Sequence, residues 1–170
     1  MLYTADYESP LGRLLIAVNE SRALVRLDFI DPERSEQWRL KVGKTQPSTG
    51  HCAEVADQLR EYFAGERKAF TLTLAAQGTP FQKQVWELLV TIPYGKTTSY
   101  GDLARRIGTI NASRAVGLAN GANPISIIVP CHRVIGSNGA LTGYGGGLDR
   151  KRALLALEGV TVGAAQAQLF

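Results

Sequence analysis

The fold of the second half of the chain is decided by residues 99–121, which read SYGDLARRIGTINASRAVGLANG. Apolar residues at helical spacing predict one helix over 99–107 and another over 113–120, with Gly108 and Asn111 marking the break between them. Two short helices joined by a glycine-containing turn indicate a helix-turn-helix. Plain packing of two helices produces the same pattern, so the pairing alone leaves both interpretations open.

Two further helices are expected on either side of this pair. Thr79-Pro80-Phe81-Gln82 has the pattern of a capping box with proline at the first helical position. A helix is therefore expected from Pro80 to Ile92, just before Pro93. A last helix is expected over Asp149–Glu158, where Gly159 ends it.

The first half of the chain predicts a small sheet instead. Short apolar segments over 2–9, 13–18 and 23–28, separated by turn residues, are typical of an antiparallel meander. Residues 31–50 predict a loop with at most a short helix, 54–64 a helix capped by Gly65, and 70–74 another strand. We therefore expect an α+β protein with two domains, residues 1–75 (sheet plus helix) and residues 79–170 (helical).

The composition excludes several classes of protein. The chain has 170 residues, of which 45% are hydrophobic and 20% charged, as in globular proteins and unlike disordered ones. Cys52 and Cys131 are its two cysteines, too few for a disulfide framework. Neither a signal peptide nor an apolar run long enough to span a membrane is recognisable. We expect a cytoplasmic protein with reduced thiols and no membrane association.

The positive charge is concentrated in the second half of the chain. Residues 1–90 contain 11 Lys and Arg against 12 Asp and Glu, whereas residues 91–170 contain eight against three. Such an excess is expected in a domain that meets a polyanion, although an ordinary solvated surface explains it equally well.

One cysteine and one histidine stand side by side in the apolar run IIVPCHRVI, residues 127–135. A thiol with its ordinary pKa of about 8.5 is a poor nucleophile near neutral pH, and an imidazole can take its proton. In an extended segment, Cys131 and His132 would point to opposite faces, so a bridging water or a bend at Pro130 would be needed. A core cysteine and a satisfied buried histidine are the alternative readings.

The segment Pro130-Cys131-His132-Arg133-Val134 resembles the active-site signature of the O6-alkylguanine-DNA alkyltransferases, a family of direct-reversal DNA-repair proteins. Further blocks resemble the family in order and spacing: Ser99–Gly101, Ser113–Gly117, Asn123-Pro124, Gly143–Gly147 and Leu154–Gly159. The resemblance is close over Gly78–Gly159 and weak over the first half. It implies a bacterial stand-alone member with a ribonuclease H-like first domain.

The resemblance implies a role for each catalytic candidate. Cys131 would accept the alkyl group from guanine O6, with His132 as a water-mediated base and Glu158 orienting that base. Tyr100 would crowd the phosphate beside the target and donate a proton to the leaving base. Asn123 would be the hinge between the recognition helix and the active-site segment. From the residues alone, Tyr100 could equally be a core tyrosine and Asn123 a helix stop.

The resemblance also implies contacts with the minor groove of double-stranded DNA. Arg114 would fill the gap left by the extruded base, while Ala115, Ala119 and Gly121 would let the helix approach closely. A minor groove about 6 Å wide does not readily admit an ordinary helix, so small side chains suit this role. A phosphate-binding or solvated Arg114, and tight packing against another helix, are the alternatives.

The implied guanine pocket uses the carbonyls of Cys131 and Val134, the amide of Gly145, and the side chains of Tyr144 and Lys151. Several family members have serine where this chain has Gly145, so a hydroxyl contribution there is absent. A solvated Lys151 is an equal alternative, and Arg133 is interpreted as a structural, loop-tying residue. His51 and Cys52, adjacent in the chain, cannot furnish a four-ligand zinc site, so neither metal nor cofactor is expected.

The function implied by the resemblance is single-turnover transfer of a methyl or other alkyl group from O6-alkylguanine, and also from O4-methylthymine, in DNA to Cys131. The base would be flipped out through the minor groove, and the protein would act as a monomer, with cooperative binding along DNA left open. The alternatives are a non-catalytic DNA binder, a helix-turn-helix regulator and a Cys-His hydrolase. Of these readings, only the repair function explains Tyr100, Arg114 and Cys131 together.

Overall fold

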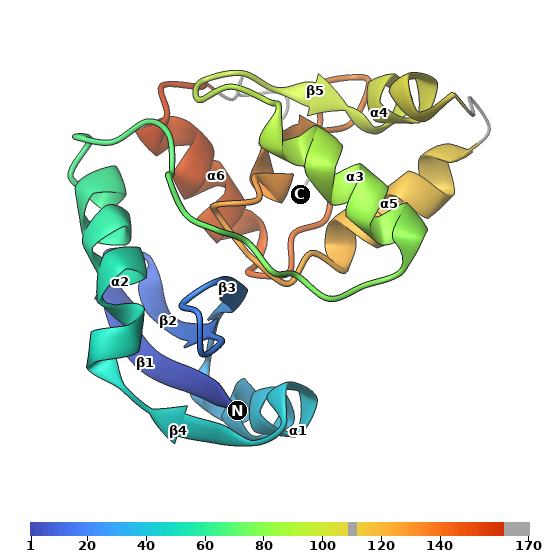
Figure 1. Cartoon of the computed structure of the whole chain (residues 1–170). Coiled ribbons are helices and arrows are strands. Elements are labelled where there is room, and N and C mark those ends of the chain that lie inside the picture. The colour runs from blue at the N-terminus through green and yellow to red at the C-terminus, as the bar shows by residue number, and fades with distance from the viewer. Residues whose placement is uncertain (109–111, 162–170) are drawn as a thin grey trace. The chain divides into compact units, whose positions relative to one another are not determined.

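A computed structural model describes residues 1–108 and 112–161 and divides them between two compact units (Figure 1). The first unit comprises Met1–Gln77 together with Pro124–Ser126, and the second comprises Gly78–Asn123 and the chain from Ile127 onward. Asn111, expected at the break between two helices, lies outside the described residues, as do residues 162–170 of the expected second domain.

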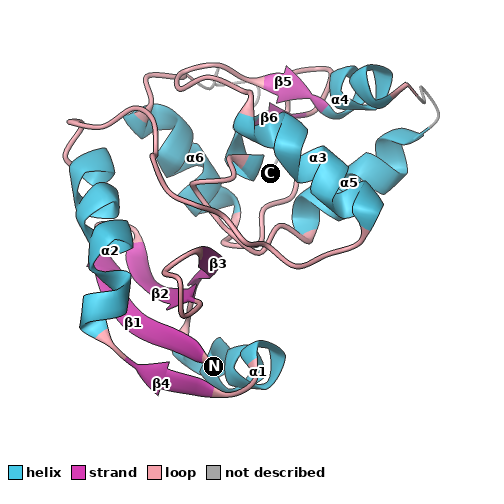
Figure 2. Ribbon diagram, in the orientation of Figure 1, coloured by secondary structure: helices cyan, strands magenta, loops and turns pink. Residues whose placement is uncertain are grey.

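The first unit is built on a four-stranded sheet (Figure 2). The strands β1 (Leu2–Ser9), β2 (Gly12–Val18) and β3 (Leu24–Phe29) form the expected antiparallel meander. The strand order is β3-β2-β1-β4. The central strand β2 is the most apolar and contributes Leu14, Ile16, Ala17 and Val18 to the core, all fully buried.

The region 31–50 contains more regular structure than the expected loop. A 3-10 turn, η1 (Pro32–Arg34), leads into α1 (Ser35–Val42), and β4 (Thr45–Pro47) then pairs with β1 in parallel. Trp38 of α1 is buried, and its Nε1 donates to Asp28 Oδ2 at 2.5 Å. Trp38 is the one buried residue of a helix that is otherwise mainly polar, which is why its periodicity is hard to see in the sequence.

Helix α2 (Thr49–Phe63) begins five residues before the expected start at Glu54. Its N-cap is Ser48, whose Oγ accepts from the His51 amide at 3.3 Å. Gly50 and the polar residues around it suggested a loop, but a glycine costs little in a first turn that is capped in this way. The helix packs on β1 and β2 with Cys52, Val55, Leu59 and Tyr62 buried.

The expected strand over 70–74 is wrong. Pairing there is confined to one bridge, Leu24 with Leu74, in which the Leu24 amide donates to Thr73 O at 2.8 Å. The buried side chain of Gln58 takes the place of a neighbouring strand, because its Oε1 accepts from the Thr71 amide at 2.9 Å. Its Nε2 donates to Thr71 Oγ1 at 3.0 Å. The alternating pattern therefore reflects packing without a ladder.

The second unit is mainly helical, as expected. Its helices are α3 (Pro80–Val90), α4 (Tyr100–Ile107), α5 (Ser113–Gly121) and α6 (Leu148–Leu157). Helix α3 has the expected capping box, in which Thr79 and Gln82 bond each other's backbone amides. Helix α4 ends at Gly108 in the left-handed conformation that favours glycine (φ 96°). The α+β fold class is confirmed.

A short parallel pair of strands, β5 (Thr98–Ser99) and β6 (Val134–Ile135), joins the start of α4 to the chain after Cys131. Helix α5 packs on both α3 and α4, and Trp86 of α3 donates from Nε1 to Ala119 O at 2.8 Å. Among the described residues, none of the helices has the length and apolar character needed to cross a bilayer.

The segment Pro124–Ser126 leaves the second unit and joins the sheet of the first. The Leu27 amide donates to Pro124 O and the Ser126 amide to Leu27 O, both at 2.9 Å. The chain is therefore fixed on β3 partway between the end of α5 and Cys131.

Candidate active site

Cys131 lies at the start of a 3-10 turn, η3 (Cys131–Arg133), and not in an extended strand. Ile127 has a positive φ of 72°, and Pro130, with ψ 63°, begins the turn that the Arg133 amide closes on Pro130 O at 3.0 Å. A bend at Pro130, one of the two arrangements expected to let Cys131 and His132 cooperate, is therefore present.

The thiol of Cys131 is buried, with 6% of the residue exposed. Burial raises its pKa, whereas a hydrogen bond with Asn123, the charge of Lys151 and the backbone amides of Cys131 and His132 lower it. Asn123, beyond the end of α5, also donates from Nδ2 to Val129 O at 2.8 Å. A thiol in these surroundings keeps its proton at rest, so a base is needed for it to act as a nucleophile.

His132 is the base candidate and is fully buried. Its Nε2 lies 2.7 Å from Glu158 Oε2, at the C-cap of α6. Burial lowers the pKa of His132, and the neighbouring Glu158 opposes that effect. Nδ1 has no hydrogen-bond partner within the described part of the chain. A neutral ring that donates from Nε2 leaves the lone pair on Nδ1 available as an acceptor.

Arg133 is buried and binds the same carboxylate. Its Nε lies 2.7 Å from Glu158 Oε1 and its Nη2 lies 3.1 Å from Oε2. Nη1 donates to Ile92 O at 2.6 Å, and the guanidinium lies 5.9 Å from the centre of the Tyr94 ring. These contacts agree with the interpretation of Arg133 as a loop-tying residue and add a direct link to the histidine's partner.

Lys151 is fully buried, so the alternative of a solvated lysine is wrong. Its ammonium donates to the carbonyls of Val134 at 2.6 Å, Thr142 at 2.7 Å and Gly143 at 3.3 Å. Burial lowers its pKa to about 8. The lysine therefore clamps the loop 136–147 to β6 and places a positive charge near Cys131.

The other pocket candidates lie around this loop. Tyr100, at the first position of α4, is partly exposed and donates to Thr142 O at 3.2 Å. Tyr144 is partly buried and Gly145 is exposed. A Cβ atom at Gly145 would meet nothing within 4 Å, so the space beside this glycine is open. The Cys131 carbonyl accepts from the Val134 amide, and the Val134 carbonyl accepts from the Lys151 ammonium.

Helix α5 presents a partly different set of residues from the one expected. Arg114, Ala115 and Gly121 are exposed, as a surface contact requires. Ala119 is a correction: it is 2% exposed, so its side chain faces the interior. Leu118, in contrast, is 73% exposed and was not identified from the sequence. Its spacing of four residues from Arg114 was the available signal, because residues at that spacing share a helix face.

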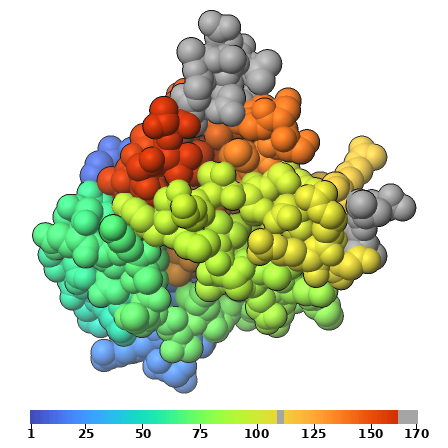
Figure 3. All heavy atoms as spheres, turned by 90° about the horizontal axis from the view of Figure 1, so that it is seen from above, coloured from blue at the N-terminus to red at the C-terminus, as the bar shows by residue number. Residues whose placement is uncertain are grey.

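Figure 3 shows atoms of α4, coloured yellow, on the surface of the second unit. Arg105 and Arg106 are exposed on this helix, and both pair with Asp102, at 3.6 and 3.2 Å. Helix α5 has no acidic residue, so the charge of Arg114 is not offset within its own helix.

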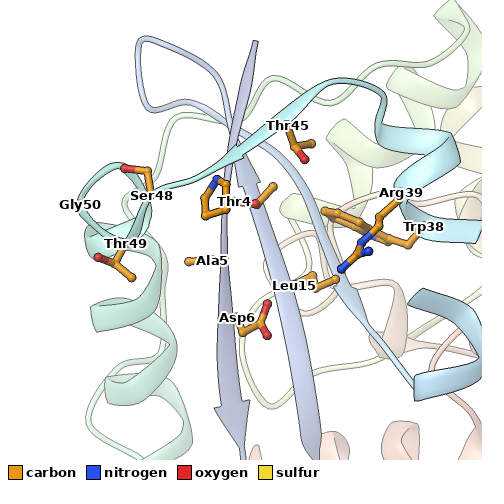
Figure 4. A pocket seen from close by; sticks show the side chains of 11 residues that line it. Thr4, Ala5, Asp6, Leu15, Trp38, Arg39, Thr45, Ser48, Thr49 and Gly50 are labelled. Atoms are coloured by element: carbon orange, nitrogen blue, oxygen red, sulfur yellow. The ribbon is translucent and has the colours of Figure 1, made fainter. Parts of the chain in front are cut away.

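A separate groove of about 900 Å³ lies within the first unit (Figure 4). It is lined by side chains of β1, α1 and the start of α2, among them Thr4, Asp6, Trp38, Arg39 and Ser48. None of its lining residues is a cysteine or a histidine, so it has no thiol or imidazole for group transfer. Within residues 1–108 and 112–161, no group of three or more His, Cys, Asp or Glu side chains could hold a metal ion.

A buried thiol beside a His-Glu pair, in a helical unit with an exposed arginine on a short helix, defines a candidate cysteine-dependent transferase. Two family models match the chain and agree with this class. Residues 80–160 match the DNA-binding domain of 6-O-methylguanine DNA methyltransferase, and residues 2–76 match its ribonuclease-like domain. The chain therefore belongs to the 6-O-methylguanine DNA methyltransferase family.

Relatives and solved structures support this assignment over most of the chain. The methylated-DNA--protein-cysteine methyltransferase of Mycobacterium tuberculosis is 50% identical over 162 residues, 93% of each chain. The constitutive enzyme of that name from Bacillus subtilis is 49% identical, over 91% of this chain and 93% of its own. The crystal structure of Mycobacterium tuberculosis OGT in complex with DNA is similar, with a TM-score of 0.82, 48% identity and 92% coverage of both chains.

Proposed function

We propose that this protein repairs alkylated DNA by transferring the alkyl group from guanine O6 to Cys131. The thiolate attacks the alkyl carbon, an S–C bond forms, and the C–O6 bond breaks with its electron pair going to O6. The observation that carries the proposal is the buried Cys131 beside the His132–Glu158 pair, whose Nδ1 lone pair is free to accept. The product is a thioether, so each molecule acts once.

The thiol proton leaves through a water molecule to His132 Nδ1. This route matches the turn at Pro130 and needs no direct contact between the two adjacent side chains. The charge of Lys151 and the hydrogen bond from Asn123 stabilise the thiolate as it forms. The guanine, which departs with an extra electron pair, takes a proton from the hydroxyl of Tyr100 and is restored as a neutral base. His132 then loses the thiol proton to solvent and Tyr100 regains a proton from solvent, so the net change is the loss of the thiol proton and its replacement on guanine.

Double-stranded DNA is bound from its minor groove by the exposed face of α5. Arg114 occupies the stack vacated by the target base, and Ala115 and Gly121 let the helix backbone approach the groove. The excess of eight basic over three acidic residues in 91–170 supports a polyanionic partner.

The extruded guanine is held by backbone groups of the second unit. The second lone pairs of the Cys131 and Val134 carbonyls accept from its amino group, and the Gly145 amide donates to O6. Tyr144 lines this pocket, and Lys151 acts on it indirectly, by holding the loop through three carbonyls. O4-methylthymine presents the same kind of alkyl ether and is a second substrate.

We also infer that the protein acts as a monomer, with cooperative binding along DNA as an additional property to be measured. We infer that it acts in the cytoplasm, where its two free cysteines stay reduced. The domain boundaries that we propose are 1–75 and 79–170, and the compact units support them through their division at Gln77.

The proposal is tested by counting repaired bases. A duplex containing O6-methylguanine, in excess over protein, should lose one methyl group per protein molecule and no more. Continued turnover would contradict the thioether product, and absence of any loss would contradict the function.

A further inference from the structure

Arg133 and His132 share the carboxylate of Glu158. Oε1 accepts from Arg133 Nε at 2.7 Å, and Oε2 accepts from Arg133 Nη2 at 3.1 Å and lies 2.7 Å from His132 Nε2. The side chains of Glu158 and His132 are fully buried and that of Arg133 is 8% exposed. One positive and one negative charge are thus fixed beside a ring that can itself take a proton.

The guanidinium is held in place independently of the histidine. Nη1 donates to Ile92 O at 2.6 Å, and the plane lies over the Tyr94 ring. Arginine stays protonated inside proteins, and a carboxylate bound by its fork is held in the ionised form. An ionised carboxylate only accepts hydrogen bonds, so His132 must carry its proton on Nε2.

We propose that Arg133 is a positioning residue that keeps one proton off the His132–Glu158 pair and so preserves the lone pair on His132 Nδ1. This inference rests on the proposed function, in which that lone pair receives the thiol proton. It goes beyond the structural, loop-tying role that the sequence suggests for Arg133.

Loss of the guanidinium would leave the carboxylate of Glu158 buried without a compensating charge. Either His132 would then take a proton and become a cation, or Glu158 would take it and donate to Nε2. In the first case both ring nitrogens carry protons. In the second case the ring proton moves to Nδ1. Both outcomes remove the Nδ1 lone pair, so both disable the base.

The other groups around His132 cannot replace Arg133. The Lys151 ammonium also lowers the pKa of His132, but its hydrogen bonds go to backbone carbonyls. Burial raises the pKa of the Cys131 thiol, so that group is neutral at rest. Burial likewise raises the pKa of Tyr94, whose hydroxyl donates to Leu157 O at 3.1 Å. The guanidinium of Arg133 contacts Glu158 directly, through Nε and Nη2.

The test compares pH–rate profiles for methyl transfer from a duplex containing O6-methylguanine. Arg133→Met should move the acidic limb to higher pH by about one to three pH units, the range by which a close charge shifts a pKa, because the positive charge that opposes protonation of His132 is removed. Glu158→Gln should move the acidic limb to lower pH, because the positive charge of Arg133 is then no longer offset by a carboxylate. The double variant should return near the parent value, since both charges are gone.

A control variant removes another arginine–glutamate ion pair, which is more exposed and lies in the first unit. Arg67 Nε lies 2.9 Å from Glu61 Oε2 in the first unit, so Arg67→Gln should leave the profile unchanged. If Arg133→Met does not fold, the double variant and Arg133→Lys carry the test. Lysine keeps the positive charge but lacks the two-pronged guanidinium. The acidic limb of Arg133→Lys should therefore lie between that of the parent and that expected for Arg133→Met.

The ring nitrogens of His132 give a second readout that needs no substrate. Nitrogen NMR at neutral pH should find a neutral ring protonated on Nε2 in the parent, and a cation or an Nδ1-protonated ring in Arg133→Met. The chain has two histidines, so His51→Gln assigns the signals. The inference would be overturned if the His132 ring in Arg133→Met had the same protonation as in the parent. It would also be overturned if Arg133→Met and Glu158→Gln lowered the rate without moving the acidic limb of the pH–rate profile. A parent that transfers no methyl group would instead overturn the proposed function.

Discussion

Cys52 and Cys131 are both buried and free, yet their surroundings differ in the property that decides reactivity. Cys52 donates weakly to Tyr3 O at 3.6 Å, and burial raises its pKa to about 11. Burial also raises the pKa of Cys131, but the side chain of Asn123, the ammonium of Lys151 and two backbone amides oppose this rise. Cys131 therefore has the groups that stabilise a thiolate, and the alkyl group should be found on it and not on Cys52.

The raised pKa of Cys52 predicts a loss of stability at high pH. The folded protein holds the thiol proton more tightly than the unfolded chain, in which nothing buries the thiol. This stabilisation is complete below about pH 9 and is lost as the pH rises toward 11. From about pH 8 to 10.5, the free energy of unfolding should fall by about 2 kcal/mol more in the parent than in Cys52→Ala. Denaturant titrations at both pH values measure this difference, and equal falls would refute it.

Two roles in DNA binding are open to Arg114, and they predict different effects of its removal. If it fills the vacated stack, Arg114→Ala should repair a paired O6-methylguanine poorly, because extrusion costs a few kcal/mol there. The defect should shrink for the same base in a single strand, and the free modified base should react almost as fast as with the parent. If Arg114 only touches phosphate, the variant should instead bind all duplexes less tightly and lose about one unit of salt dependence. An equal loss of rate on every substrate would remove its role in extrusion.

At the scale of the element, the exposed face of α5 contains an apolar residue among small ones. Leu118 is 73% exposed and lies one turn after Arg114, and apolar side chains act as wedges in minor-groove binders. Leu118→Ala should weaken duplex binding roughly fivefold, about 1 kcal/mol of lost apolar contact. The reaction with the free modified base should be unchanged.

Leu40 supplies the matched control for that variant. It is an 80% exposed leucine on α1 in the first unit, so Leu40→Ala removes the same atoms from a surface with no proposed DNA contact. Equal affinities of Leu118→Ala and Leu40→Ala for duplex DNA, measured by titration at fixed salt, would contradict the wedge.

The elements that the sequence predicts well are those with local signals. Thr79 and Gln82 form a capping box from adjacent side chains, and Gly108 ends α4 through its own backbone freedom. The misses have tertiary causes. Helix α1 is fixed by the burial of Trp38, and the segment around Thr71 is held by Gln58, thirteen residues away. Local periodicity contains neither contact.

At the scale of the whole molecule, the same distinction applies to the site. The signature around Cys131 identifies the thiol and its neighbouring base, because these residues are contiguous. The pairing of Arg133 with Glu158 spans 25 residues, and the burial of Lys151 and Ala119 depends on how helices pack. Those features required the structure.

The most direct test of the account is mass spectrometry of the protein after incubation with a duplex containing O6-methylguanine. The account predicts a mass gain of one methyl group, located on Cys131 in the tryptic peptide 115–133, and no gain in Cys131→Ser, which should still bind the duplex. An unmodified protein after complete incubation, or a methyl group on Cys52 in peptide 45–60, would contradict it.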